Sequence, residues 1–188
     1  SGFLHELADG QYIPAQSTYE SGEIGEKQFF LHGHAVSGSL RDREVTATHA
    51  NSGATDKATF TVVKVDVDVD ADNDGAIGEA DDPLEEDPGG ILATGTVKRI
   101  ALKLEPAGLT GTLKLTAESG GNHIRVWRDA AKTSPVTLPA EWSLSGGYTF
   151  PTALYVEGTD ASAAARDVHL RLRYTAVSDQ YVDDDIRL

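Results

Sequence analysis

The sequence contains no cysteine and no methionine, and it lacks any long apolar segment. The absence of cysteine excludes disulfides, thiolate metal ligands and a cysteine nucleophile. No apolar run approaches the roughly 20 residues that a membrane-spanning helix needs, so we expect no insertion into a membrane. Basic residues are outnumbered as well: 16 lysines and arginines stand against 30 acidic residues, and the net charge is -14. This charge disfavours nucleic acid and anionic membrane surfaces as partners.

The chain also lacks helix signals, and the spacing of its glycines and prolines is typical of β-structure. The 19 glycines and 7 prolines divide the chain into short runs that are rich in β-branched residues. Several runs alternate apolar and polar residues, as strands with one buried face do. The strand-like runs are 27–38, 43–50, 57–70, 95–106, 111–120, 123–129, 134–139, 151–158 and 166–178. Together they predict an all-β fold of tandem antiparallel β-sandwiches of the immunoglobulin-like (Ig-like) kind.

A domain boundary is predicted near residues 64–66. Residues 1–64 would form a small or incomplete Ig-like β-domain that ends in a "TFTVV" run. Residues 65–188 have enough strands for a complete Ig-like β-sandwich, with a calcium-binding loop at 66–87 between two of its strands. No Pro/Gly-rich linker separates the halves, so we expect a stiff junction.

The stretch "DVDVDADNDGAIGEAD", residues 66–81, places seven carboxylates within sixteen residues. Its first part alternates valine with aspartate, so the valines can enter a core while the aspartates form a row on the opposite face. Like charges at this density repel one another, and a bound cation would relieve the repulsion.

The second part of the stretch fits a calcium-loop template. Asp70, Asp72, Asp74 and Gly75 fill the pattern D-x-[DN]-x-[DN]-G. Calcium takes six to eight oxygen ligands, and carboxylates at every second residue of a tight loop can surround it. The alternative is an acidic loop that water alone solvates. The expected metal ligands are Asp68, Asp70, Asp72, Asp74, Ala76 through its carbonyl, Glu79 and Asp81.

The loop resembles those of EF-hands, and the aspartate at its twelfth position, Asp81, resembles the dockerin form. No helix can follow, because Pro83, Pro88 and a Gly-Gly pair interrupt the next residues. The combination "VDVDADNDGAIG…GGIL", over about residues 63–94, resembles the calcium-binding Ig-like middle domain of protein-arginine deiminases and β-modules of bacterial extracellular proteins. This resemblance implies a fold and a structural Ca²⁺ ion. It does not imply the deiminase activity, since the catalytic domain is absent.

No enzyme motif is recognisable: the chain has no G-x-S-x-G, no H-E-x-x-H and no P-loop. We therefore expect a non-enzymatic, calcium-stabilised module at the cell surface or outside the cell. It would have a structural, adhesion or assembly role, and its partners would be other domains of the same protein or neighbouring subunits.

Two alternatives remain open from the sequence. In the first, the protein is a carbohydrate-binding module, in which Trp127 and Arg125 on the outer face of a strand would contact a glycan. In the second, it is a filament subunit that assembles by β-strand addition, with the N-terminal "FLHELADGQYIPAQ" joining a neighbour's sheet edge.

Overall fold

The computed structural model of the protein describes residues 2–8, 11–14, 29–33, 37–39, 41, 43–70, 93–145, 150–160 and 168–188. The chain divides into two compact units, Ser1–Val62 and Val63–Leu188. The division lies close to the boundary expected from the sequence.

The first unit contains a sheet with the strand order β2-β1-β3 and a separate hairpin formed by β4 and β5. All of these pairings are antiparallel. The hairpin turn is fixed locally, because the Nδ1 atom of His49 lies 2.8 Å from the hydroxyl of Ser52 and Gly53 adopts a φ of 66°. The strands are β1 (Gly2–Ala8), β2 (Gln11–Pro14), β3 (Phe29–Gly33), β4 (Arg43–Thr48) and β5 (Thr55–Phe60).

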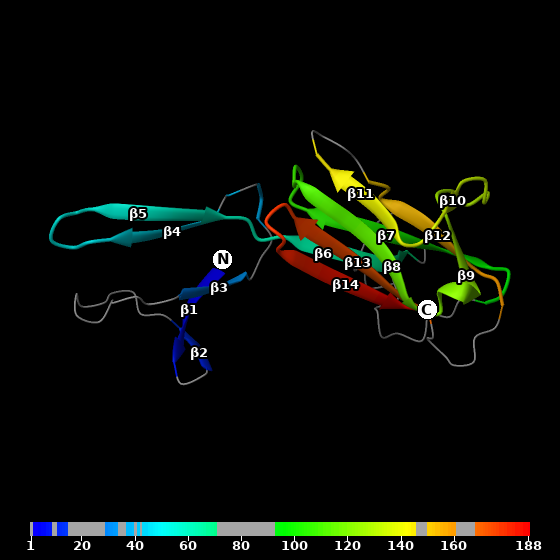
Figure 1. Ribbon diagram of the computed structural model, residues 1–188, viewed down its shortest axis with the longest axis horizontal. Helices are drawn as coiled ribbons and strands as arrows, with labels where there is room; N and C mark the ends of the chain where they lie inside the picture. The colour runs from blue at the N-terminus through cyan, green and yellow to red at the C-terminus, as the bar shows by residue number, and fades with distance from the viewer. Residues whose placement is uncertain are drawn as a thin grey trace. The chain divides into compact units, whose positions relative to one another are not determined.

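The second unit is a sandwich of two antiparallel sheets (Figure 1). The first sheet has the order β10-β9-β12-β7-β6, and the second sheet has the order β11-β8-β13-β14. The strands of the first sheet are β6 (Lys64–Asp70), β7 (Val97–Glu105), β9 (Ile124–Trp127), β10 (Pro135–Val136) and β12 (Ala153–Gly158). Those of the second sheet are β8 (Gly111–Ser119), β11 (Ala140–Leu144), β13 (His169–Ala176) and β14 (Tyr181–Arg187).

The described residues contain no α-helix, and their one short helical turn is the 3-10 turn η2 (Gly121–His123). The prediction of an all-β sandwich is therefore confirmed. Alternation explains several strands of the sandwich, because β9, β12 and β13 each bury every second residue.

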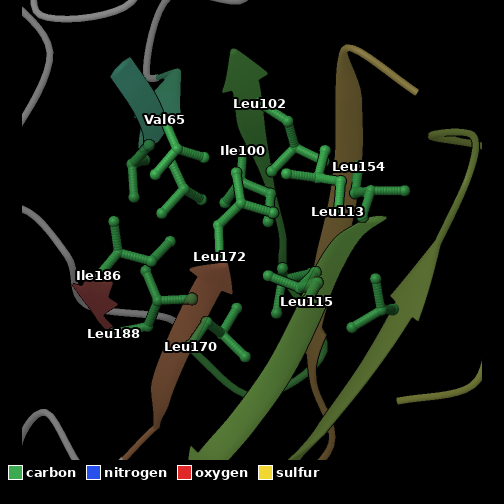
Figure 2. Packing of buried hydrophobic residues seen from close by; sticks show 14 of the residues in the cluster. Val65, Ile100, Leu102, Leu113, Leu115, Leu154, Leu170, Leu172, Ile186 and Leu188 are labelled. Carbon is green, nitrogen blue, oxygen red and sulfur yellow. The ribbon is translucent and has the colours of Figure 1, made fainter. Parts of the chain in front are cut away.

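A single hydrophobic core fills the space between the two sheets (Figure 2). Leu113 and Leu115 of β8 and Leu170 and Leu172 of β13 are fully buried. Ile100 of β7 meets them from the first sheet, and the valines of β6 complete this wall. Full burial of one such side chain contributes about 1.5–3 kcal/mol, so this layer of aliphatic residues accounts for much of the stability of the second unit.

The strand-like run over residues 57–70 is divided between two strands. The chain forms β5 up to Phe60 and starts β6 at Lys64. The break has a topological cause: β5 pairs with β4 in the first unit, whereas β6 pairs with β7 in the second. Residues 61–63, which are Thr-Val-Val, connect the two sheets.

Candidate functional sites

Strand β6 carries the first acidic residues of the predicted calcium site. Its aspartates alternate with three buried valines, as the sequence predicts. Exposure on the aspartate face decreases along the strand. The side chain of Asp66 is 18% exposed, whereas Asp68 and Asp70 are only 7% and 2% exposed. The acidic row is therefore buried most deeply at the end that leads into the predicted loop.

Cations and hydrogen-bond donors accompany these carboxylates. Asp70 lies opposite Arg99 of β7 and forms an ion pair with it. Asp66 pairs with Lys64, and this hydrogen bond raises the pKa of the Lys64 ammonium group. Asp68 accepts a hydrogen bond of 2.8 Å from the backbone N–H of the next residue. A buried carboxylate stays ionised only when cations or hydrogen-bond donors contact it. The end of β6 therefore favours the binding of a positively charged group.

Two of the predicted metal ligands, Asp68 and Asp70, lie in the described residues, and β6 places both on the same face. The others lie outside the described residues: Asp72, Asp74, Ala76, Glu79 and Asp81. Within the described part of the chain, no group of three or more His, Asp or Glu side chains gathers as a metal site would require. Carboxylate oxygens are the ligands that calcium prefers, so the donors that β6 presents fit this ion.

The free edge of β6 is covered by a carboxylate that the sequence analysis missed. Asp184 of β14 accepts a 2.8 Å hydrogen bond from the backbone N–H of Val67. It lies opposite Leu172, so it shares the core-facing side of its sheet. An inward-pointing charge of this kind blocks the pairing of a further strand. The available signal was an aspartate on the apolar face of β14, between Val182 and Ile186.

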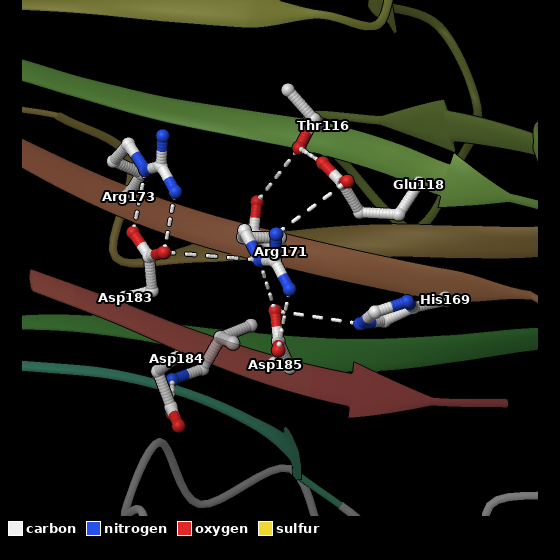
Figure 3. A network of polar contacts seen from close by, with 9 residues as sticks. Thr116, Glu118, His169, Arg171, Arg173, Asp183, Asp184 and Asp185 are labelled. Carbon is white, nitrogen blue, oxygen red and sulfur yellow. Dashed lines mark hydrogen bonds and ion pairs between the residues drawn. The ribbon is translucent and has the colours of Figure 1, made fainter.

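The outer face of the second sheet carries a ladder of ion pairs (Figure 3). Arg171 contacts Asp185 through two nitrogens, at 2.7 and 3.1 Å, and Arg173 contacts Asp183 twice at 2.6 Å. Arg171 also lies 3.5 Å from Glu118. The Arg171 guanidinium holds the pKa of Asp185 below its ordinary value. These groups satisfy one another, so we assign the ladder a structural role; exposed pairs of this kind contribute about 0–1 kcal/mol each.

A cavity of about 640 Å³ lies on the side of the sandwich away from β6 and β14. Strand β11 pairs with β8 only as far as Leu115, and in the described residues no strand accompanies β8 beyond that point on this side. The cavity is lined by this end of β8, by η2, β9 and β10, and by Leu138 and Pro139. Both residues of the predicted ligand site, Arg125 and Trp127, belong to its lining.

The alternation predicted for β9 is confirmed. Ile124 and Val126 are buried, whereas Arg125 is exposed and Trp127 is half-buried. The indole N–H of Trp127 donates a 3.0 Å hydrogen bond to Glu157 on the neighbouring strand β12. No sequence pattern indicates this partner, because the two residues meet only through strand pairing.

Glu157 is itself held in place. Its second carboxylate oxygen lies 2.8 Å from the ammonium group of Lys132. The Lys132 hydrogen bond, and after it the Trp127 indole, lowers the pKa of Glu157 below its ordinary value. The other tryptophan, Trp142, is 4% exposed and belongs to the core. The two tryptophans thus differ in role: one packs the sandwich, and one borders a cavity.

Comparison of the chain with models of protein families finds no match, and a search of curated proteins finds none either. The described residues contain no helix that is long and apolar enough to cross a membrane. The acidic end of β6 and the cavity beside β9 are therefore the two candidate sites in the described part of the second unit.

Proposed function

We propose that this protein is a non-enzymatic β-sandwich module that is stabilised by calcium and belongs to a larger surface or secreted protein or fibre. The burial of Asp68 and Asp70 is the observation that carries the proposal. Water solvates an ordinary acidic run, whereas these two carboxylates are removed from water at the point where the D-x-D-x-D-G pattern begins.

The proposed ligand set combines the described strand with the residues that follow it. Asp68 and Asp70 would contribute from β6, and Asp72, Asp74, the carbonyl of Ala76, Glu79 and Asp81 would contribute from the loop. The ion would supply positive charge to a carboxylate cluster that otherwise repels itself. Arg99 would hold Asp70 at the rim of the site, since the ion pair fixes its position on the sheet.

The setting follows from the chemistry of such sites. Extracellular modules bind calcium with dissociation constants of about 10⁻⁴–10⁻³ M, a range in which calcium outside cells fills the site. The resemblance of residues 63–94 to calcium-binding Ig-like modules supports an Ig-like classification and an extracellular or cell-surface location. The partners would be other domains of the same protein or neighbouring subunits, which a stiffened sandwich would hold at a fixed spacing.

Thermal melting tests the proposal. We expect the melting temperature of the full chain to rise in millimolar calcium and to fall in EDTA, because an ion bound only to the folded state stabilises it by mass action. The double variant Asp72→Asn with Asp74→Asn should melt at one temperature in both conditions. Asp179→Asn, which removes one negative charge from an exposed turn outside the loop, serves as the control. Equal melting of the wild type in calcium and in EDTA would refute the proposal.

A further inference from the structure

We infer that the lateral cavity beside β9 is a binding site for a neutral saccharide. Its volume of about 640 Å³ lies within the 300–1,000 Å³ that is usual for small-ligand sites. The site is separate from the calcium-binding strand, since β6 and β9 lie at different positions of the first sheet. The inference therefore does not depend on the proposed calcium.

One wall of the cavity is apolar. It is formed by the side chains of Val136 and Leu138 together with Pro135 and Pro139. The half-buried indole of Trp127 borders the same space. A sugar ring presents C–H groups on its faces, and such faces pack on aromatic and aliphatic surfaces of this kind.

The polar lining supplies the complementary chemistry. Arg125 is exposed and lies opposite Glu157 of β12, and its positive charge is one of the causes that lower the pKa of that carboxyl group. Glu118 accepts a 2.7 Å hydrogen bond from the Thr116 hydroxyl and lies 3.5 Å from Arg171, and both contacts help to position its carboxylate. A sugar hydroxyl both donates and accepts. The guanidinium of Arg125 can therefore donate to one hydroxyl, while the carboxylate of Glu118 accepts from another.

The charges favour a neutral ligand. Arg125 and Glu118 bring opposite charges to one cavity, and the chain as a whole carries -14. A polyanionic glycan would be repelled at long range by this field. A neutral sugar meets no such barrier and can use both charged groups as hydrogen-bond partners.

A peptide strand fits the cavity less well than a sugar does. The edge of β8 past Leu115 could pair with a peptide over only a few residues, from Thr116 to Ser119. On the other side, Pro135 and Pro139 lack the N–H groups that a second ladder would need. A short, one-sided ladder supplies little of the main-chain bonding on which strand addition depends.

Trp127 is arranged in advance for binding. Its indole N–H is fixed by Glu157, and Lys132 fixes Glu157 in turn. A ligand would therefore meet a ring whose orientation is already set, which reduces the conformational entropy lost on binding.

The two tryptophans make a direct test possible. In a ¹⁵N–¹H spectrum of the full chain, each indole gives one N–H signal, and Trp127→Phe assigns them. We would titrate the protein with neutral cello-, manno-, xylo- and chito-oligosaccharides. We expect at least one of them to shift the Trp127 signal while the signal of the core residue Trp142 stays in place.

Matched variants identify the binding groups. Trp127→Ala and Arg125→Ala should each weaken the binding of that oligosaccharide by about tenfold or more, which corresponds to about 1.4 kcal/mol. Arg128→Ala removes a neighbouring exposed arginine that does not line the cavity, and it should leave the affinity unchanged. Trp127→Phe keeps an aromatic ring, so it shows whether a loss in Trp127→Ala reflects the missing ring or a damaged fold.

Three results would overturn the inference. In the first, no oligosaccharide in the panel shifts the Trp127 signal. In the second, Arg128→Ala weakens binding as much as Arg125→Ala does. In the third, a Thr/Val-rich extended peptide shifts the Trp127 signal while the sugars do not, which would make the cavity a peptide groove. The oligosaccharide titration is run on the wild type in calcium and also on the Asp72→Asn, Asp74→Asn variant. Sugar binding by both proteins would show that the cavity works independently of the proposed calcium site.

Discussion

The sandwich of the second unit and the β4–β5 hairpin of the first unit share the same alternation of apolar and polar residues. Only in the sandwich does this alternation bury one face of the strands. In the sandwich, alternation buries one face of every long strand, and Val67 of β6 is 1% exposed. In the hairpin, most residues of both strands remain exposed, although Val45 and Ala47 alternate with polar residues in the same way. Alternation therefore specifies a strand, and only a second layer of structure turns that strand into part of a core.

The two regions also differ in the contacts that protect the edges of their sheets. The edge of β6 is protected by a half-buried carboxylate, Asp184, which accepts a hydrogen bond from a backbone N–H of that strand. In the hairpin, the described side-chain contacts run mainly within the hairpin itself: Lys57 pairs with Glu44, and His49 holds the turn. The sandwich is closed by long-range contacts, whereas the hairpin depends on local ones.

The largest expected effect comes from a matched pair of valine substitutions. Val67→Ala should destabilise the sandwich by about 2–3 kcal/mol, because two methyl groups leave a packed core and a cavity remains. Val45→Ala should cost at most about 1 kcal/mol, since this side chain is only partly buried. Calorimetric unfolding measures the first change, and amide exchange over residues 43–60 measures the second. A comparable loss of stability in both variants would mean that Val45 is packed as tightly as a core residue is.

Calcium removal should separate the two regions next. Because the proposed ligands lie in β6 and in the residues that follow it, we expect EDTA to accelerate amide exchange in β6 and β7 and to leave β4 and β5 unchanged. At calcium levels about 100-fold above the dissociation constant, the stabilisation would be about 2.7 kcal/mol. Hydrogen exchange followed by mass spectrometry resolves these segments. Faster exchange that is confined to the hairpin would contradict the placement of the site.

The edge carboxylate should give a smaller effect. Asp184→Ala leaves the N–H of Val67 without this acceptor, and we expect a loss of about 1–3 kcal/mol in a urea titration. Asp184→Asn keeps an acceptor oxygen and should recover part of the loss. If the two variants are equally stable, the hydrogen bond to β6 does not protect this edge.

Acid should produce the smallest effect. The Arg171 guanidinium lowers the pKa of Asp185 below its ordinary value of about 3.8. The stability from this pair is therefore complete above about pH 4 and is lost as the pH falls towards the lower pKa of the folded state. Asp185→Asn should flatten this dependence in melting curves recorded between about pH 4 and pH 2. Glu44→Gln, which changes an exposed hairpin carboxylate, should leave the melting of the sandwich unchanged.

The sequence was sufficient for the features that depend on local alternation. It predicted the all-β fold, the outward placement of Arg125 and Trp127 on β9 and the inward valines of β6, because period-two patterns report which face is apolar. It could not reveal at which residues β5 ends and β6 begins within the run 57–70, since the choice of partner strand is a long-range property. The partners of the site residues were not predictable for the same reason. Arg99 contacts Asp70, Asp184 contacts Val67, and Glu157 contacts Trp127. Strand pairing and sheet packing alone bring these pairs together.

The most direct test of the account is a calcium titration of the full chain by isothermal calorimetry, in parallel with the Asp72→Asn, Asp74→Asn variant. We expect the wild type to bind calcium saturably, with a dissociation constant of about 10⁻³ M or lower, and we expect the variant to lose that binding. An absence of binding in the wild type, or equal binding in both proteins, would contradict the claim that the acidic end of β6 and its loop hold a structural calcium ion.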